Sequence, residues 1–311
     1  MTSSRRVGTN ESISTYYSGG GKDYSLLTTW EAATDNNLVT GAVSEVLECY
    51  ARSHNDRVTL AGATTNSSYF RIIRPASSQG HAGIPKFDGS CVAFASTVAN
   101  HGIVATEAYA SIQDLVVKLT INSTTTYAAL GAYNAYAGRS FVGCLVVDSV
   151  NAGAGVVHGI YMAPGSGIDG YIVNCLVHNN DGMGIEGDTG NTYIYNTTSV
   201  GNADYDLVGT AGGNLYAKNV IYGDRSTVNW TETTCTNGSP AYVDSANDNF
   251  MLAPSDYVAK NQGTNLSGDS KFAFDDDILE SVRGIWDIGF YEDMSVFPPL
   301  FKPKTNHLLR R

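Results

Sequence analysis

The chain has 311 residues, with 19 Lys and Arg against 30 Asp and Glu, and a hydrophobic content of 42%. This composition excludes a disordered chain, and the lack of long Ala/Glu/Lys/Leu runs excludes a coiled coil or helical bundle. The net charge of −11 disfavours broad electrostatic binding to nucleic acid. The 33 glycines, together with many Asn, Thr, Ser and Tyr residues, indicate β structure rich in turns.

The sequence also bears on targeting and redox state. No apolar stretch follows residues 1–6, and no run of about 18 apolar residues occurs, so we expect neither a signal peptide nor a membrane-spanning helix. The five cysteines include no Cys-x-x-Cys pair, which fits neither a disulfide framework nor a zinc site. We expect reduced thiols, with Cys144 and Cys175 buried next to each other.

In chain order, the first predicted element is a short amphipathic helix at residues 23–33, which would cover the N-terminal end of the fold. Its N-cap is predicted at Ser25 or Thr28. Its apolar side consists of Leu27, Trp30 and Ala33. The first coils of the following fold are predicted at residues 43–58 and 69–74, where aromatic and β-branched residues favour strands.

A repeat follows in the middle of the chain. Five segments align without gaps at intervals of 22 to 31 residues, and they begin at Ile112, Phe141, Ile172, Ile194 and Ala217. A second aligned column precedes them and contains Ile103, Leu130, Ile160, Ile185 and Leu207. The pattern predicts two short strands in each coil of a solenoid, because no single coil could bury its own apolar side.

The spacing selects among β architectures. Asn-Gly and Asp-Gly turns do not punctuate the repeat, and the period is shorter than a propeller blade requires, so a sandwich or a propeller is disfavoured. Asn174, Asn196 and Asn219 fall in one column, where their side chains could bond along the stack at a bend. The sequence therefore predicts a parallel β-helix, right-handed by the usual crossover rule.

Motifs at both ends of the repeat region add a family resemblance. They are DYS at residues 23–25, WEA at 30–32, PAYVD at 240–244, DNFML at 248–252 and WDIGFYE at 286–292. Together with the coil pattern, they resemble the bacterial and phage right-handed β-helix repeat proteins. The resemblance implies an all-β fold with an N-terminal arm (1–22), a capped right-handed parallel β-helix (23–292) and an extended C-terminal arm (293–311). Because that family includes polysaccharide lyases, hydrolases, phage tail proteins and surface proteins, the resemblance does not choose a function.

Carboxylates gather in successive coils of the second half of the repeat. The candidates are Asp181, Glu186 and Asp188 in one coil, Asp204 and Asp206 in the next, and Asp224 with Arg225 beyond, with His158 and His178 as possible proton carriers. Adjacent coils stack about 4.8 Å apart, so such carboxylates could form either a calcium-binding cluster with a nearby Arg or Lys as base or the pair that glycoside hydrolysis requires. The competing interpretation, which the sequence favours, is turn chemistry, because most of these Asp residues lie beside Gly or Asn.

Other chemistry receives little support. Residues 275–277 lack the spacing of a calcium loop, and no nucleotide-binding or nucleophile-elbow motif is present, so we expect no metal and no cofactor. His101 and His158 each precede Gly-Ile at the same repeat position, which favours a structural role. Exposed tyrosines suit either strand structure or stacking on sugars, and the candidates are Tyr127, Tyr133, Tyr136 and Tyr161.

The chain ends in a Pro-stiffened arm with apolar and basic side chains. We expect it to assemble with a partner through Phe297, Leu300, Phe301, Lys302, Lys304, Leu308, Leu309, Arg310 and Arg311. Arg5 and Arg6 would make the N-terminus a second basic arm that docks on acidic neighbouring subunits.

Two classes of function follow from the sequence. The first hypothesis is a non-catalytic structural or binding component of a phage particle, located in the virion and assembled with other virion subunits or with copies of itself. The alternative is a polysaccharide lyase or glycoside hydrolase, or a module that binds surface glycan without cleaving it. Neither hypothesis involves nucleic acid or a membrane as a partner.

Overall fold

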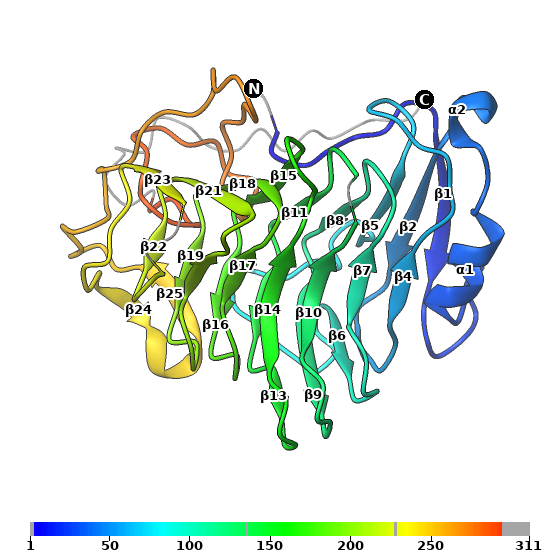
Figure 1. The fold of residues 1–311 in the computed structure, drawn as a ribbon, viewed down its shortest axis with the longest axis horizontal. Coiled ribbons are helices and arrows are strands. Elements are labelled where there is room, and N and C mark those ends of the chain that lie inside the picture. Colours follow the sequence, from blue (N-terminus) through cyan, green and yellow to red (C-terminus); the bar gives the residue numbers. More distant parts are fainter. Residues whose placement is uncertain (1–2, 135, 227–228, 294–311) are drawn as a thin grey trace, which may run out of the picture.

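The computed structural model describes residues 3–134, 136–226 and 229–293 and shows an elongated stack of coils (Figure 1). The coils form three parallel sheets, and each complete coil contributes one strand to each sheet. The predicted all-β fold, a parallel β-helix, is therefore confirmed. Within the described segments, no helix is long and apolar enough to cross a membrane.

The three sheets are named here by their number of strands. The nine-stranded sheet contains β1 (Glu11–Tyr16), β2 (Ser44–Cys49), β5 (Arg71–Pro75), β8 (Ser111–Gln113), β11 (Ser140–Val142), β15 (Asp169–Val173), β18 (Gly190–Tyr195), β21 (Gly213–Lys218) and β23 (Trp230–Thr233). The eight-stranded sheet contains β3 (Arg52–His54), β6 (Val92–Ser96), β9 (Val116–Ile121), β12 (Leu145–Val147), β16 (Leu176–His178), β19 (Thr198–Val200) and β22 (Ile221–Tyr222), with β13 (Val150–Asn151) beside β9. The six-stranded sheet contains β4 (Val58–Leu60), β7 (Ile103–Ala105), β10 (Tyr127–Ala132), β14 (Val157–Met162), β17 (Ile185–Gly187) and β20 (Leu207–Gly209).

Both predicted columns exist in the strand registers. In the nine-stranded sheet, successive partners are Ile112, Phe141, Ile172, Ile194 and Ala217. In the six-stranded sheet, successive partners are Ile103, Leu130, Ile160, Ile185 and Leu207. All ten side chains are buried, so the two columns face each other across the interior of the coils.

The number of strands per coil differs from the prediction, because each complete coil has three strands rather than two. Each aligned six-residue segment contains two strands separated by a bend at its third residue. The bend residues all have left-handed backbone angles, with φ between 46° and 64°, and they are Asp114, Gly143, Asn174, Asn196 and Asn219. A left-handed residue turns the chain sharply, and Asn, Asp and Gly tolerate that conformation best.

The predicted asparagine ladder forms in part at this bend: Asn196 and Asn219 bond to each other, while the Asn174 side chain bonds to Ser4, Asp276 and Arg283 instead. The amide groups of Asn196 and Asn219 lie 2.8 Å apart, and both residues are fully buried. The side-chain oxygen of Asn219 also accepts a hydrogen bond from the backbone N–H of Thr264, 2.7 Å away. At the other end of the row, the Asn174 oxygen accepts from the Arg283 guanidinium at 3.3 Å. The asparagines at the bend therefore also bind the segment that follows the coils, through Thr264 and Arg283.

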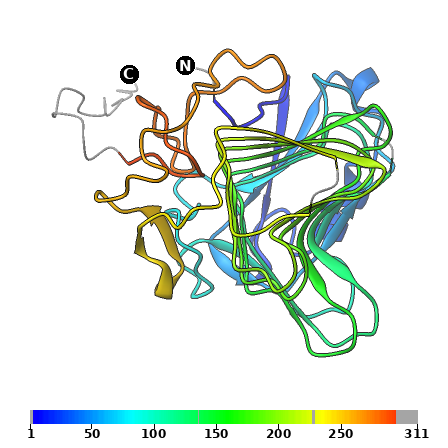
Figure 2. The same cartoon turned by 60° about the vertical axis from the view of Figure 1, so that its left-hand side comes forward.

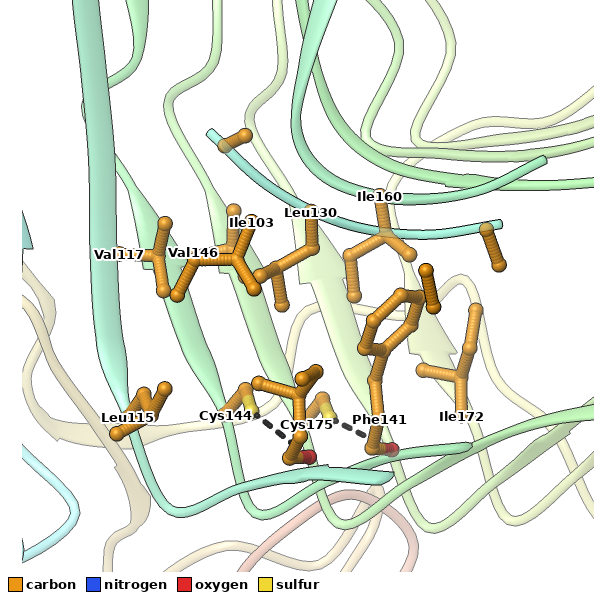
Figure 3. Packing of buried hydrophobic residues seen from close by; sticks show 14 of the residues in the cluster. Ile103, Leu115, Val117, Leu130, Phe141, Cys144, Val146, Ile160, Ile172 and Cys175 are labelled. Carbon is orange, nitrogen blue, oxygen red and sulfur yellow. Dashed lines mark hydrogen bonds between the residues drawn. The ribbon is translucent and has the colours of Figure 1, made fainter. Parts of the chain in front are cut away.

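Figure 3 shows the interior, where the two apolar columns meet. Cys144 and Cys175 follow two successive bends and are buried beside one another, as predicted. Each thiol donates to a backbone carbonyl, Cys144 to Ile112 and Cys175 to Phe141, both at 3.6 Å. Burial raises the pKa of the Cys144 thiol, which makes it a packing group rather than a nucleophile. The redox state of the pair remains a prediction.

Two short helices lie at the N-terminal end of the stack, α1 (Leu27–Ala33) and α2 (Leu38–Gly41) (Figure 1). Leu27 and Trp30 are buried as predicted, but Ala33 is exposed. The predicted N-cap residues are wrong, because α1 starts after Leu26 and no side chain of that residue caps it. Instead, the carboxylate of Asp56 accepts the Leu27 N–H at 2.8 Å. The cap comes from the first coil, which local sequence could not reveal.

The N-terminal segment is part of the fold rather than a free arm. Strand β1 extends the nine-stranded sheet by parallel pairing with β2, so the sheet begins before the expected boundary at residue 22. Arg5 pairs with Asp114 at 2.5 Å and with Asp276 at 3.4 Å. Arg6 lies over the ring of Phe70, 4.4 Å from its centroid. Both cations contact their own chain, which contradicts the expectation that they dock on neighbouring subunits.

After the coils, the chain folds back along their sides. It forms the hairpin of β24 (Tyr242–Asp244) and β25 (Asn249–Leu252), joined by a 3₁₀ turn at Ser245–Asn247. Phe250 packs on outward residues of the eight-stranded sheet, and Trp286 packs on those of the nine-stranded sheet. Among the residues that the structure describes, the apolar clusters over these two sheets include none from the six-stranded sheet. Figure 2 shows the superposed coils and the two connections, after β9 and β13, that project beyond them.

Candidate active site on the six-stranded sheet

The outer face of the six-stranded sheet carries a cluster of polar and aromatic side chains. Tyr161 on β14 and Glu186 on β17 are direct partners in the strand register. Each follows a buried isoleucine, so strand alternation turns both side chains outward. The next partner along the sheet, on β10, is Gly131, and the ring of Tyr133 lies over it. Strands β4 to β17 run side by side in Figure 1.

Glu186 is the carboxyl group with the most altered acidity in this cluster. Its side chain is only 14% exposed. Burial, reinforced by the charges of Asp188 and Asp204, raises the pKa of Glu186 to about 7. A carboxylic acid in such surroundings keeps its proton close to neutral pH, which is the property of a general acid.

His158 lies against Glu186, with 3.5 Å between its Nε2 atom and the nearer carboxyl oxygen. Its Nδ1 atom accepts the backbone N–H of Met183 at 2.9 Å. Burial lowers the pKa of His158, and Asp204 and Asp181 oppose that shift. The neutral ring therefore carries its proton on Nε2, where it points at Glu186 and stabilises the ionised carboxylate. The hydrogen bond that Nδ1 accepts gives His158 the predicted structural role, while Nε2 faces Glu186 and can interact with its carboxyl group.

Two stacked tyrosines extend the cluster along the sheet. The rings of Tyr133 and Tyr161 lie 4.6 Å apart and are almost parallel, at 21°. The Tyr161 hydroxyl donates to Asp188 at 2.7 Å, and the Thr210 hydroxyl donates to the other oxygen of that carboxylate at 2.6 Å. The Tyr133 hydroxyl contacts Nδ1 of His101 at 3.0 Å. Hydroxyls and rings at this face suit a ligand that has both hydrogen-bonding groups and apolar faces, such as a sugar.

The structure separates the four carboxylates that the sequence offers as catalytic candidates, Asp181, Glu186, Asp204 and Asp206, into two pairs. Glu186 and Asp204 form the first pair, because Asp204, which is exposed on the next coil, lies near enough for its charge to help raise the pKa of Glu186. Asp181 instead holds the chain that leads into β14, because its carboxylate accepts the backbone N–H groups of Asn151 and Val157. Asp206 is 2% exposed.

The Asp206 carboxylate is fully engaged by the surrounding turns. It accepts hydrogen bonds from the backbone N–H groups of Asn202, Gly223 and Asp224 and from the Asn202 amide. Burial raises its pKa, but no lone pair is left for a substrate. The turn chemistry that the sequence favoured therefore describes Asp181 and Asp206, and not Glu186 and Asp204.

The remaining candidates lie elsewhere. Asp224 accepts the backbone N–H of Asp206 at 2.9 Å, and Arg225 packs over the ring of Trp230 at 4.9 Å. His178 lies on the eight-stranded sheet under the C-terminal hairpin, with its ring 4.4 Å from that of Phe250. None of the three belongs to the Glu186 cluster.

Sequence reasoning missed the pairing of Tyr161 with Glu186, although the signal was present. Aligning Ile160 with Ile185 in the second column places the next residues of both strands side by side. It also missed Thr210, which no motif marks. Within the described ranges, no three His, Cys, Asp or Glu side chains are arranged to hold a metal ion. The nine assembly candidates between Phe297 and Arg311 lie outside the described residues.

Comparisons with known proteins give little beyond the fold. No protein-family model and no curated protein matches the chain. Among solved structures, the chain is similar to the crystal structure of pectate lyase Pel9A, with 12% identity and a TM-score of 0.38 over 93% of this chain and 98% of that one. A likeness at this level carries no information about activity, and the bacterial and phage type implied by the terminal motifs remains a prediction.

Proposed function

We propose that this protein is a glycoside hydrolase that cleaves a neutral polysaccharide on the outer face of its six-stranded sheet. The observation that carries the proposal is Glu186, a carboxyl group whose pKa is raised to about 7, which lies next to His158 and Tyr161 on the sheet and within range of the charge of the exposed Asp204. Glycoside hydrolysis uses such a pair, one carboxyl group as the acid and the other as base or nucleophile.

Glu186 is assigned as the general acid that protonates the glycosidic oxygen. When it loses its proton, the Nε2–H of His158 faces the new charge from 3.5 Å. Asp204 is assigned as the second carboxylate, because it is exposed and lies on the adjacent coil. Asp188 is a positioning residue, since its carboxylate is held by the Tyr161 and Thr210 hydroxyls and its charge helps to keep Glu186 protonated.

The charge of the site favours hydrolysis of a neutral glycan over elimination from a uronate. In the described part of the chain, no Lys or Arg forms an ion pair with Glu186, Asp188 or Asp204. Elimination requires stabilisation of negative charge that develops beside the uronate carboxylate, and cations or a metal usually provide it. The carboxylates of Asp188 and Asp204, which have no Lys or Arg partner in the described ranges, would repel a polyanionic chain, as would Glu186 once it ionises.

The test is product analysis with a panel of neutral and anionic polysaccharides. Hydrolysis of a neutral glycan releases reducing ends without ultraviolet absorbance, whereas elimination releases unsaturated, absorbing products. We expect the first result, and we expect Glu186→Gln to reduce the rate at least about 100-fold. The substitution copies the protonated side chain, so its melting temperature should stay close to that of the original protein.

A matched control is Glu280→Gln, since the Glu280 side chain is 70% exposed on the C-terminal segment. It should retain full activity. Unsaturated products would identify a lyase and contradict hydrolysis. Binding without cleavage would contradict the catalytic assignment, and full activity in Glu186→Gln would exclude Glu186 as the acid.

A further inference from the structure

A second polar site lies on the N-terminal coils, apart from Glu186. A cavity of about 330 Å³ is lined by residues 62–65, which follow β4, by residues 106–108, which follow β7, and by Tyr136. These segments follow the carboxyl ends of β4 and β7, just as Asp188 follows the carboxyl end of β17. Because the strands are parallel, their carboxyl ends lie on the same side of the sheet, so the cavity and the Glu186 cluster lie along one line parallel to the axis of the solenoid.

One loop connects the two places. Tyr133 and Tyr136 both belong to the chain that follows β10, and β10 lies between β7 and β14 in the sheet. The ring of Tyr133 stacks on Tyr161 in the Glu186 cluster, while Tyr136 lines the cavity and is 46% exposed. A chain-like ligand that passes over Tyr133 would therefore meet Tyr136 at the cavity.

The lining of the cavity is about equally polar and apolar, and among the described residues that line it none carries an unpaired charge. Its charged residue, Glu107, is 3% exposed, and both of its oxygens accept hydrogen bonds from the fully buried Arg71. The other lining groups include three threonines and the Tyr136 ring. Hydroxyl groups and one aromatic ring suit an uncharged sugar. The ion pair between Arg71 and Glu107 holds the backbone of the cavity lining in place.

We propose that this cavity is a remote sugar-binding subsite, which makes the protein an endo-acting enzyme that favours long neutral glycans over short ones. The inference rests on the proposed hydrolase function for its catalytic consequence. From β17 to β7 and β4 there are three to four strand spacings of about 4.8 Å each, or about 14–19 Å. A hexose unit in an extended chain is about as long as one spacing, so a disaccharide at Glu186 cannot reach the cavity.

The experiment measures both binding and cleavage of neutral oligosaccharide ladders, from disaccharides to octasaccharides, in the gluco-, xylo- and manno-series, with oligogalacturonides as the anionic comparison. We expect affinity and kcat/KM to rise with chain length up to about five or six units and then level off. Tyr136→Ala should lower both about tenfold for the long members and leave the shortest unchanged. Tyr257→Ala, at a residue 86% exposed elsewhere on the surface, is the control and should change neither.

Outcomes separate this inference from the proposed function. Length-dependent binding that requires Tyr136, without cleavage, would support the subsite while contradicting the hydrolase. Cleavage that is independent of length, or that Tyr136→Ala lowers equally for short and long chains, would overturn the subsite alone. Binding of none of the neutral ladders, or preference for oligogalacturonides, would also overturn it.

Discussion

At the scale of single residues, the left-handed bends decide where one sheet ends and the next begins. Asn219 shows why these positions are polar. Its φ is 55°, it is fully buried, and its side chain bonds to Asn196, Thr234 and Thr264. The side chain both tolerates the backbone angle and satisfies polar groups that the bend leaves inside the protein.

Replacing Asn219 separates these two contributions. Asn219→Ala should lower the free energy of unfolding by about 2–4 kcal/mol, because alanine is strained at positive φ and leaves buried polar groups without partners. Asn219→Gly should cost about half as much, since glycine accepts the angle. Guanidinium denaturation followed by circular dichroism measures both. Equal stability of the two variants would show that backbone strain makes no contribution.

The candidate site was predictable only in part at this scale. The carboxylate cluster and the tyrosines could be found because they recur in successive coils. The acidity of Glu186 could not, because it depends on burial and on the charges of Asp188 and Asp204, which only the folded coils bring near. The four hydrogen bonds that the Asp206 carboxylate accepts could not be predicted from the sequence either, because their donors lie in separate turns.

At the scale of elements, each strand is held by its neighbours above and below. Ile172 lies between Phe141 and Ile194 in the register and is fully buried. Ile172→Ala should therefore lower the free energy of unfolding by about 2–5 kcal/mol through lost burial and a new cavity. Ile285→Ala, at a position 57% exposed, should change it by less than about 0.5 kcal/mol. A similar loss in both variants, measured by the same denaturation, would contradict the predicted stacking of the columns.

The elements themselves were predictable to different degrees. Strand positions followed from the repeat, because stacking forces like residues onto like residues. The third strand of each coil was missed, because the strands on either side of the bend follow each other within one aligned six-residue segment, such as residues 112–117. The start of α1 was missed because its cap, Asp56, comes from another element.

At the scale of the whole molecule, the C-terminal segment divides the surface. It covers the outer faces of the nine- and eight-stranded sheets with apolar residues such as Trp286 and Phe250, so the six-stranded sheet presents its own side chains. The N-terminal segment also packs on its own chain, where Arg5 pairs with Asp114 and Arg6 lies over Phe70. A location in a virion and assembly through the C-terminal arm remain predictions that the described residues do not test.

The most direct test of the account is the pH dependence of kcat/KM for hydrolysis of a neutral polysaccharide, because this parameter reports the groups of the free enzyme. The general acid must be protonated to act, and the pKa of Glu186 is about 7. Activity should therefore fall as the pH rises through about 7, and Glu186→Gln should lack both the activity and this limb. A rate that stays constant or rises between about pH 6 and 8.5 would contradict the assignment of Glu186 as the acid.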